Sequence, residues 1–130
     1  MDKIIRVDTS RFFVGVSREL RMSLVANRAG PQHGVDGLLV TFAEMTRDAP
    51  HAGEQHPDGD ELIYIVSGRV RVTTEPSDAE PCELGPGEAC IISKGEWHRV
   101  RLLEPTRVIA ITAGPRAMHR PLLRRQPMPL

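Results

Sequence analysis

Two histidines and two glutamates in this chain have residue types and spacings suited to holding a metal ion. Three of them follow the pattern Glu54-x-His56-x4-Glu61, and His98 lies further along the chain. Side chains two residues apart on a β-strand point to the same side, so Glu54 and His56 are expected to face the same way. Two imidazoles with one or two carboxylates suit Fe(II), Mn(II), Ni(II), Zn(II) or Cu(II), whereas a structural zinc site would use thiolates. Two histidines and one carboxylate would leave coordination positions open for a substrate or dioxygen, as a catalytic metal requires.

The elements that must position these side chains are short strands. Apolar runs recur about every ten residues between Gly, Pro and Asp clusters, and no stretch keeps a helical apolar repeat over three turns. Ser67-Gly68, Pro86-Gly87 and Lys94-Gly95 mark tight turns. The expected strands are Lys3–Val7, Leu20–Ala26, Gly37–Met45, His51–His56, Glu61–Val66, Arg69–Glu75, Ala79–Leu84, Ala89–Ile92, Trp97–Leu102 and Arg107–Thr112.

This number of short strands predicts an all-β fold. Eight or more of them joined by tight turns close into a barrel or a two-sheet jelly roll, because closure removes unpaired strand edges. The 130 residues are enough for one domain with its own core. The segment 17–29 could also form a short helix, and we assign it as a strand.

The two clusters resemble the two sequence motifs of the cupin superfamily, and the chain is similar to its small single-domain members. The first motif, G-x5-H-x-H-x3,4-E-x6-G, and the second, G-x5-P-x-G-x2-H-x3-N, are both met in part between residues 48 and 102. The matching residues are His56, Glu61, Gly68, Gly87, Gly95 and His98. The resemblance implies a jelly-roll β-barrel that holds one divalent transition metal, Fe, Mn, Zn or Ni, through the two histidines and Glu61.

The departures from these motifs bear on the metal. Glu54 stands where the family usually has its first histidine, so it is the expected fourth ligand, with a solvated carboxylate beside the metal as the alternative. An added carboxylate favours harder ions such as Mn(II) or Fe(II). His51 is a possible substitute ligand, but it has the opposite strand parity and would need a bulge at Gly53 to point inward. The remaining departures are at turn and packing positions, namely Asp48, Ser93 and Leu102.

Other residues that could do chemistry receive simpler interpretations. Tyr64 and Trp97 are expected to pack, and His33 and His119 to lie on the surface. The acidic turn of Asp58 and Asp60 is interpreted as a polar hairpin tip. The two cysteines, Cys82 and Cys90, have no C-x-x-C spacing and are interpreted as free thiols.

Composition restricts the partners. Lys plus Arg and Asp plus Glu both total 17, so no net charge attracts nucleic acid or an anionic membrane. The apolar runs are shorter than a membrane span, and the first twenty residues lack a secretory signal pattern. We therefore expect a cytoplasmic protein whose partner is a small molecule.

Two further expectations concern the outside of the barrel. In residues 61–66 and 108–111 both alternating faces are apolar, so the outer face must be covered by the N-terminal strands or by a second subunit, and we expect a homodimer. Residues 115–130 contain four prolines and four arginines. Because proline is excluded from central strands, this segment is expected to be an extended C-terminal arm with solvated arginines.

Two classes of function fit these residues. The resemblance favours an enzyme that binds a small polar metabolite by metal chelation, either as a dioxygenase or as an isomerase or lyase. In an isomerase or lyase, Glu54 or His51 would move the substrate proton while the metal acts as a Lewis acid. The alternative is a non-catalytic binding or sensing cupin, with or without a metal, since a fold does not determine a function.

Overall fold

The computed structural model describes residues 3–28, 34–75 and 80–122, and within them the regular elements are all strands. The strands are β1 (Phe12–Ser17), β2 (Met22–Ala26), β3 (Gly37–Met45), β4 (Glu54–Gln55), β5 (Glu61–Ser67), β6 (Val70–Thr74), β7 (Cys82–Leu84), β8 (Ala89–Ile92), β9 (His98–Leu102), β10 (Thr106–Ala113) and β11 (Met118–His119). In the described ranges no helix is long and apolar enough to span a membrane.

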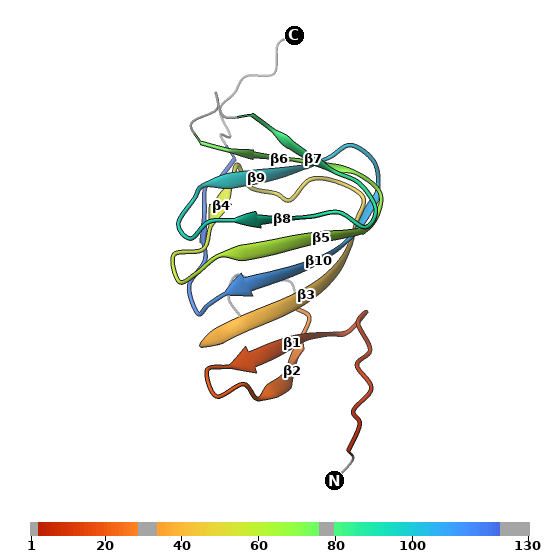
Figure 1. The fold of residues 1–130 in the computed structure, drawn as a ribbon, viewed down its shortest axis with the longest axis vertical. Coiled ribbons are helices and arrows are strands. Elements are labelled where there is room, and N and C mark those ends of the chain that lie inside the picture. The colour runs from red at the N-terminus through yellow and green to blue at the C-terminus, as the bar shows by residue number, and fades with distance from the viewer. Residues whose placement is uncertain (1–2, 29–33, 76–79, 123–130) are drawn as a thin grey trace.

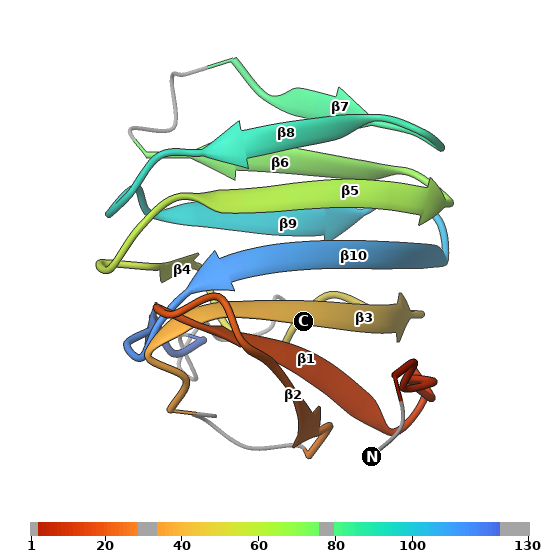
Figure 2. The same cartoon turned by 60° about the horizontal axis from the view of Figure 1, so that its bottom comes forward.

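The strands form two antiparallel sheets. The larger sheet has the order β2-β1-β3-β10-β5-β8, and the smaller has the order β11-β4-β9-β6-β7. Figure 1 shows that β3, β10, β5 and β8 lie side by side, and the turned view of Figure 2 shows β9 and β6 of the smaller sheet behind them. The two sheets face each other, which is the jelly-roll arrangement expected from the sequence.

The hydrophobic core lies between the sheets. It is made by Ile63 and Ile65 of β5, Val70 and Val72 of β6, Leu84 of β7 and Ile92 of β8. Because alternate residues of a strand share a face, Glu61 points to the same interior as Ile63 and Ile65. One carboxylate is therefore carried into the barrel by the strand that supplies its most buried side chains.

The turn between β5 and β6 depends on Gly68. Its φ is 92°, a conformation that L side chains rarely adopt. A Cβ at this position would also lie 2.7 Å from Thr106 Cα and press on Pro105 O. The tight turn at Ser67-Gly68 is thus confirmed, and glycine is required there for two separate reasons.

The N-terminal strand was predicted in the wrong place. Lys3–Val7 is not a strand, and Ile4 and Ile5 are exposed. The first strand is β1, which pairs with β2 on one side and with β3 on the other. A turn at Asp8, whose carbonyl accepts hydrogen bonds from Arg11 N and Phe12 N, separates the two segments. Pairing partners, rather than the apolar run itself, decide which segment becomes a strand.

Several other boundaries are shorter than expected. Of the strand expected over His51–His56, only Glu54–Gln55 pairs. Of the described part of the strand expected over Ala79–Leu84, only Cys82–Leu84 pairs, and Ala79 itself lies outside the described residues. Segment 17–29 contains the strand β2 and no helix over the residues described there. Cys82 and Cys90 are free thiols, as predicted.

The C-terminal arm lies along its own barrel over the residues described. It leaves β10 through the cis peptide bond Gly114–Pro115 and forms β11, which pairs with β4. Arg116 forms an ion pair with Asp58, and Arg120 forms one with Glu75 and lies over the ring of Trp97. The arm therefore crosses from the larger sheet to the edge of the smaller one. Arg124 and Arg125 lie outside the described residues.

Candidate metal centre

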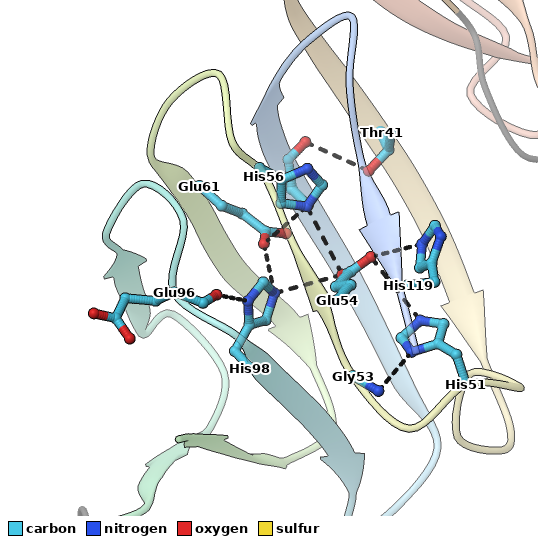
Figure 3. A network of polar contacts seen from close by, with 10 residues as sticks. Thr41, His51, Gly53, Glu54, His56, Glu61, Glu96, His98 and His119 are labelled. Carbon is cyan, nitrogen blue, oxygen red and sulfur yellow. Dashed lines mark hydrogen bonds and ion pairs between the residues drawn. The ribbon is translucent and has the colours of Figure 1, made fainter. Parts of the chain in front are cut away.

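Four side chains converge at one end of the barrel interior. Glu54 lies on β4, His56 directly after it, Glu61 at the start of β5 and His98 at the start of β9. One ligand atom from each lies within 4.8 Å of the others. Pairing of Glu54 with His98 across β4 and β9 brings the distant histidine in. Figure 3 shows the four side chains pointing toward one another from these strands.

The distances define a common point between two imidazoles and two carboxylates. His98 Nε2 lies 2.8 Å from Glu61 Oε1 and 3.5 Å from Glu54 Oε1. His56 Nε2 lies 3.4 Å from Glu61 Oε1 and 3.9 Å from Glu54 Oε1. The two Nε2 atoms and the two Oε1 atoms thus face the same small volume.

Three of the four atoms that face this volume have no hydrogen-bond partner among the described residues. His56, Glu61 and His98 are 8%, 4% and 3% exposed. Glu61 Oε1, His98 Nε2 and both ring nitrogens of His56 are buried and make no hydrogen bond. Such groups are costly unless something satisfies them. The lone pairs of these imidazole nitrogens and carboxylate oxygens can be satisfied by a metal ion, or by a proton on each imidazole.

The orientation of His98 is set by its backbone surroundings. Its Nδ1 lies 3.0 Å from the carbonyl oxygen of Glu96, to which a protonated Nδ1 donates. That hydrogen bond leaves the Nε2 lone pair directed at the cluster, as in histidines that ligate metals.

In the absence of a metal, the carboxylates favour protonated imidazoles. Burial opposes the charged form of both histidines, but contacts with Glu54 and Glu61 outweigh it and raise the pKa of His56 to about 9 and of His98 to about 10. Burial also opposes ionisation of Glu54, and its contacts with the two histidines outweigh that effect and lower its pKa. Both imidazoles therefore carry a proton when the cluster is empty of metal, and a divalent ion would replace those protons.

Acidic side chains in the turn between β4 and β5 fix the loops around the cluster. Asp60 Oδ1 accepts a hydrogen bond from Lys94 N at 2.7 Å, and His56 O accepts one from Gly95 N at 3.1 Å. Asp58 accepts hydrogen bonds from the backbone and the guanidinium of Arg116. The acidic turn is polar and partly exposed, as interpreted from the sequence, and its carboxylates in addition anchor the β8–β9 loop and the C-terminal arm.

Two more histidines lie against the far oxygen of Glu54. His119 Nε2 is 3.1 Å and His51 Nε2 is 3.9 Å from Glu54 Oε2, and the two rings are 4.8 Å apart. His51 Nδ1 accepts a hydrogen bond from Gly53 N, so in the neutral ring Nε2 carries the proton and points it at Glu54. Glu54 thus presents one oxygen to the cluster and the other to this outer pair.

The outer pair was only half anticipated. His51 reaches the edge of the site beside Gly53, whose positive φ of 140° departs from the regular strand that parity assumed. His119 lies on the surface, as expected, with its side chain 39% exposed, and it also pairs with Glu54 across β11 and β4, which was not expected. No spacing in the sequence indicated that the arm returns to this strand. His33 lies outside the described residues.

A cavity of about 330 Å³ adjoins the cluster. Glu54, His56 and Glu61 line it at one side, and inward residues of β3 and β10 and the start of the arm complete its wall. The site therefore combines a buried ligand set with space for a small molecule.

Comparison with known proteins identifies the fold. The family model of the cupin domain matches residues 39–112. Among solved structures, KdgF from Halomonas sp. is 29% identical with a TM-score of 0.51, covering 62% of this chain and 72% of that one. A cupin-2 domain containing protein from Shewanella frigidimarina is 20% identical with a TM-score of 0.51, covering 62% and 72%. Oxalate decarboxylase from Bacillus subtilis is 17% identical with a TM-score of 0.55, covering 65% of this chain and 24% of that one. No match was found among curated proteins.

Proposed function

Because this chain belongs to the cupin domain family, we propose that it is an enzyme that holds one divalent transition metal and acts on a small molecule bound to that metal. His56, Glu61 and His98 would be the metal ligands, and Glu54 Oε1 the fourth. The observation that supports this most is that four buried donor atoms converge while three of the four side chains have atoms with no hydrogen-bond partner.

The donor set fits Fe, Mn, Zn or Ni. It offers two imidazole nitrogens and two carboxylate oxygens without thiolate. A bound ion of this kind supplies Lewis-acid polarisation of a chelated carbonyl or carboxylate, or, for Fe and Mn, redox chemistry with dioxygen. The adjoining cavity gives a substrate access to the ion from the side of β3 and β10.

The protein's own residues offer a proton path beside the ligands. Glu54 Oε2 contacts His119 Nε2 at 3.1 Å and faces the Nε2–H of His51. We propose Glu54 and His51 as the groups that take up and return a substrate proton in an isomerase or lyase, with Glu54 shared between metal and proton. In a dioxygenase Glu54 would serve only as a ligand, and His51 would only orient Glu54 and the substrate.

Metal analysis tests the metal site. Protein purified without a chelator or a nickel column is expected to carry one equivalent of Fe, Mn, Zn or Ni, measured by elemental analysis. His98→Ala and Glu61→Ala should abolish it, and Glu44→Ala, an exposed carboxylate paired with Arg107, is the matched control. Metal-free protein that stays empty after anaerobic reconstitution would overturn the proposal and leave a metal-free binding role.

Dioxygen dependence separates the two kinds of enzyme. An enzyme that keeps its turnover with Zn(II) cannot be an oxygenase, because Zn(II) has no redox chemistry. An enzyme that loses turnover only under anaerobic conditions cannot be the isomerase or lyase. The same assay therefore decides the reaction class once a substrate is found.

The proposed assembly is a homodimer through the outer face of the larger sheet. Tyr64, Val66 and Ile91 point away from the core and are 37%, 44% and 70% exposed. Among the described residues, β1 and β2 extend this sheet at its edge rather than covering the face of β5 and β8. An exposed apolar face of this kind is typical of a subunit interface. A second copy is the occupant that we propose.

Light scattering tests the dimer. The mass in solution is expected to be twice the 14.4 kDa of one chain. Ile91→Glu should shift it toward the monomer, whereas Ile5→Glu, at an exposed position outside the sheets, should leave it unchanged. A mass near one chain at working concentrations would rule the dimer out.

A further inference from the structure

The wall of the cavity beside the metal cluster is built mostly from apolar side chains. It includes Leu39, Ala43 and Met45 of β3, Val108 and Ala110 of β10 and Ile63 of β5. All lie on the strand faces that point between the two sheets, in register with the inward residues of their neighbours. Apart from the metal cluster, this wall could hold a molecule by burying apolar surface.

Small side chains at the centre of this wall create the space. Ala110 is paired with Thr41 on one side and with Ile63 on the other, and Ala43 is paired with Val108. A larger residue at position 43 or 110 would fill the cavity with protein. At the ~30 Å³ that one water occupies in the liquid, 330 Å³ corresponds to about ten non-hydrogen atoms.

Polar groups in the rest of the lining are few. The hydroxyls are those of Thr41 and Thr112. Thr41 Oγ1 already faces the carbonyl of Ala110 at 3.4 Å, which leaves it weak as a donor to a ligand. Arg116 is the one cationic side chain in this lining besides the histidines, and its guanidinium is paired with Asp58. The several hydroxyl groups of a sugar-like substrate would therefore lose water here and gain few partners along the apolar wall.

We infer that the substrate has two parts: an oxygen-rich head that chelates the metal, and an unsubstituted alkyl or branched hydrocarbon body of about four to six carbons that lies against β3 and β10. This inference rests on the proposed function for its head and on the cavity wall for its body. It differs from the expectation of a small polar metabolite. The mostly apolar lining disfavours a polyhydroxylated acid of the same length.

A series of hydroxamates that share the metal-chelating head and differ in the hydrocarbon tail tests whether the cavity binds an apolar body. Straight-chain compounds from acetohydroxamate to octanohydroxamate are titrated into Co(II)-loaded protein by calorimetry. Affinity is expected to rise about fourfold for each CH2 that is buried, and to stop rising once the cavity is full. Hexanohydroxamate should bind more tightly than gluconohydroxamate, which has the same six-carbon chain with hydroxyl groups.

A variant and a methyl spectrum locate the tail. Ala110→Leu should end the rise at a shorter tail without changing the affinity for acetohydroxamate, while Ala89→Leu, exposed on β8, is the matched control. In protein with labelled alanine methyls, hexanohydroxamate should shift the signals of Ala43 and Ala110 and spare that of Ala89. The spectrum needs no metal, so it also serves protein that takes up no Co(II).

The outcomes separate the two proposals. Failure to bind Co(II) would contradict the metal site alone, and the methyl shifts of metal-free protein would still decide the body. Co(II) binding with equal affinity for all tails, or tighter binding of gluconohydroxamate, would overturn the apolar body and leave the metal site intact. The apolar body would also be overturned if the methyl signals of Ala43 and Ala110 stay unshifted in both the Co(II)-loaded and the metal-free protein.

Discussion

Uptake of a metal ion by the metal-free protein should release about two protons at pH 7.5. Contacts with Glu54 and Glu61 outweigh burial and raise the pKa of His56 to about 9 and of His98 to about 10. At pH 7.5 groups with these pKa values are ~97% and more than ~99% protonated. A metal binds only the neutral imidazole, so both protons must leave.

The same count sets how affinity varies with pH. With two protons displaced, the association constant should increase about 100-fold for each pH unit between 6.5 and 8.5, and level off as pH passes the two pKa values. Calorimetric titration of Mn(II) or Co(II) in two buffers of different ionisation enthalpy gives the number of protons at each pH. Titration at several pH values in one buffer gives the slope.

A matched variant tests the cause. Glu54→Gln removes one of the two carboxylates that hold the histidines protonated, so fewer than two protons should be released at pH 7.5 and the slope should decrease. Asp36→Asn, at an exposed carboxylate paired with Arg18, should leave the count unchanged. Release of no protons, with an affinity independent of pH, would show that both imidazoles are neutral and that the carboxylates do not pair with them.

Three further results are expected. The folded pKa values of His56 and His98 lie above the unfolded value of 6.5. The contribution of these two histidines to the stability of the metal-free protein is therefore complete below pH 6.5 and is lost as pH rises through about 9 to 10. A melting temperature that stays level to pH 10 would contradict this. Gly68→Ala should lower the free energy of unfolding by about 2 kcal/mol or more in denaturant titration, because of its positive φ and its contact with Thr106; an unchanged midpoint would refute the strain. His119→Gln should weaken metal affinity about tenfold through Glu54, as measured by calorimetry. Met118→Leu on the same strand should leave the affinity unchanged. If His119→Gln binds the metal as tightly as the unaltered protein, His119 has no part in holding Glu54.

Most of the candidate metal cluster could be anticipated because its information is local, whereas the distant His98 was identified through its match to the second cupin motif. Glu54 and His56 are two residues apart, Glu61 follows one turn later, and Gly68 and Gly95 mark turns whose conformation few other residues accept. Strand parity and turn chemistry need no knowledge of distant partners. Such features position most of the cluster in advance.

The outer histidines could not be anticipated in the same way. His119 reaches Glu54 only because β11 pairs with β4, which lies more than sixty residues earlier in the chain. The N-terminal error has a similar origin, since β1 exists as a strand between β2 and β3 while the equally apolar Ile4 and Ile5 have no partner strand. Pairing between strands far apart in the chain decides both the approach of His119 to Glu54 and the position of the first strand. Such pairing could not be predicted from one sequence.

The two oxygens of Glu54 would join the arm and a bound metal in one thermodynamic cycle. Whatever free energy the arm contributed to metal affinity through His119, the metal would return to the docking of the arm, because linkage between two binding events is reciprocal. Occupancy of the buried cluster would then be reported at the protein surface, where β11 is exposed. A change in the arm would in turn alter how long a metal ion resides in the barrel.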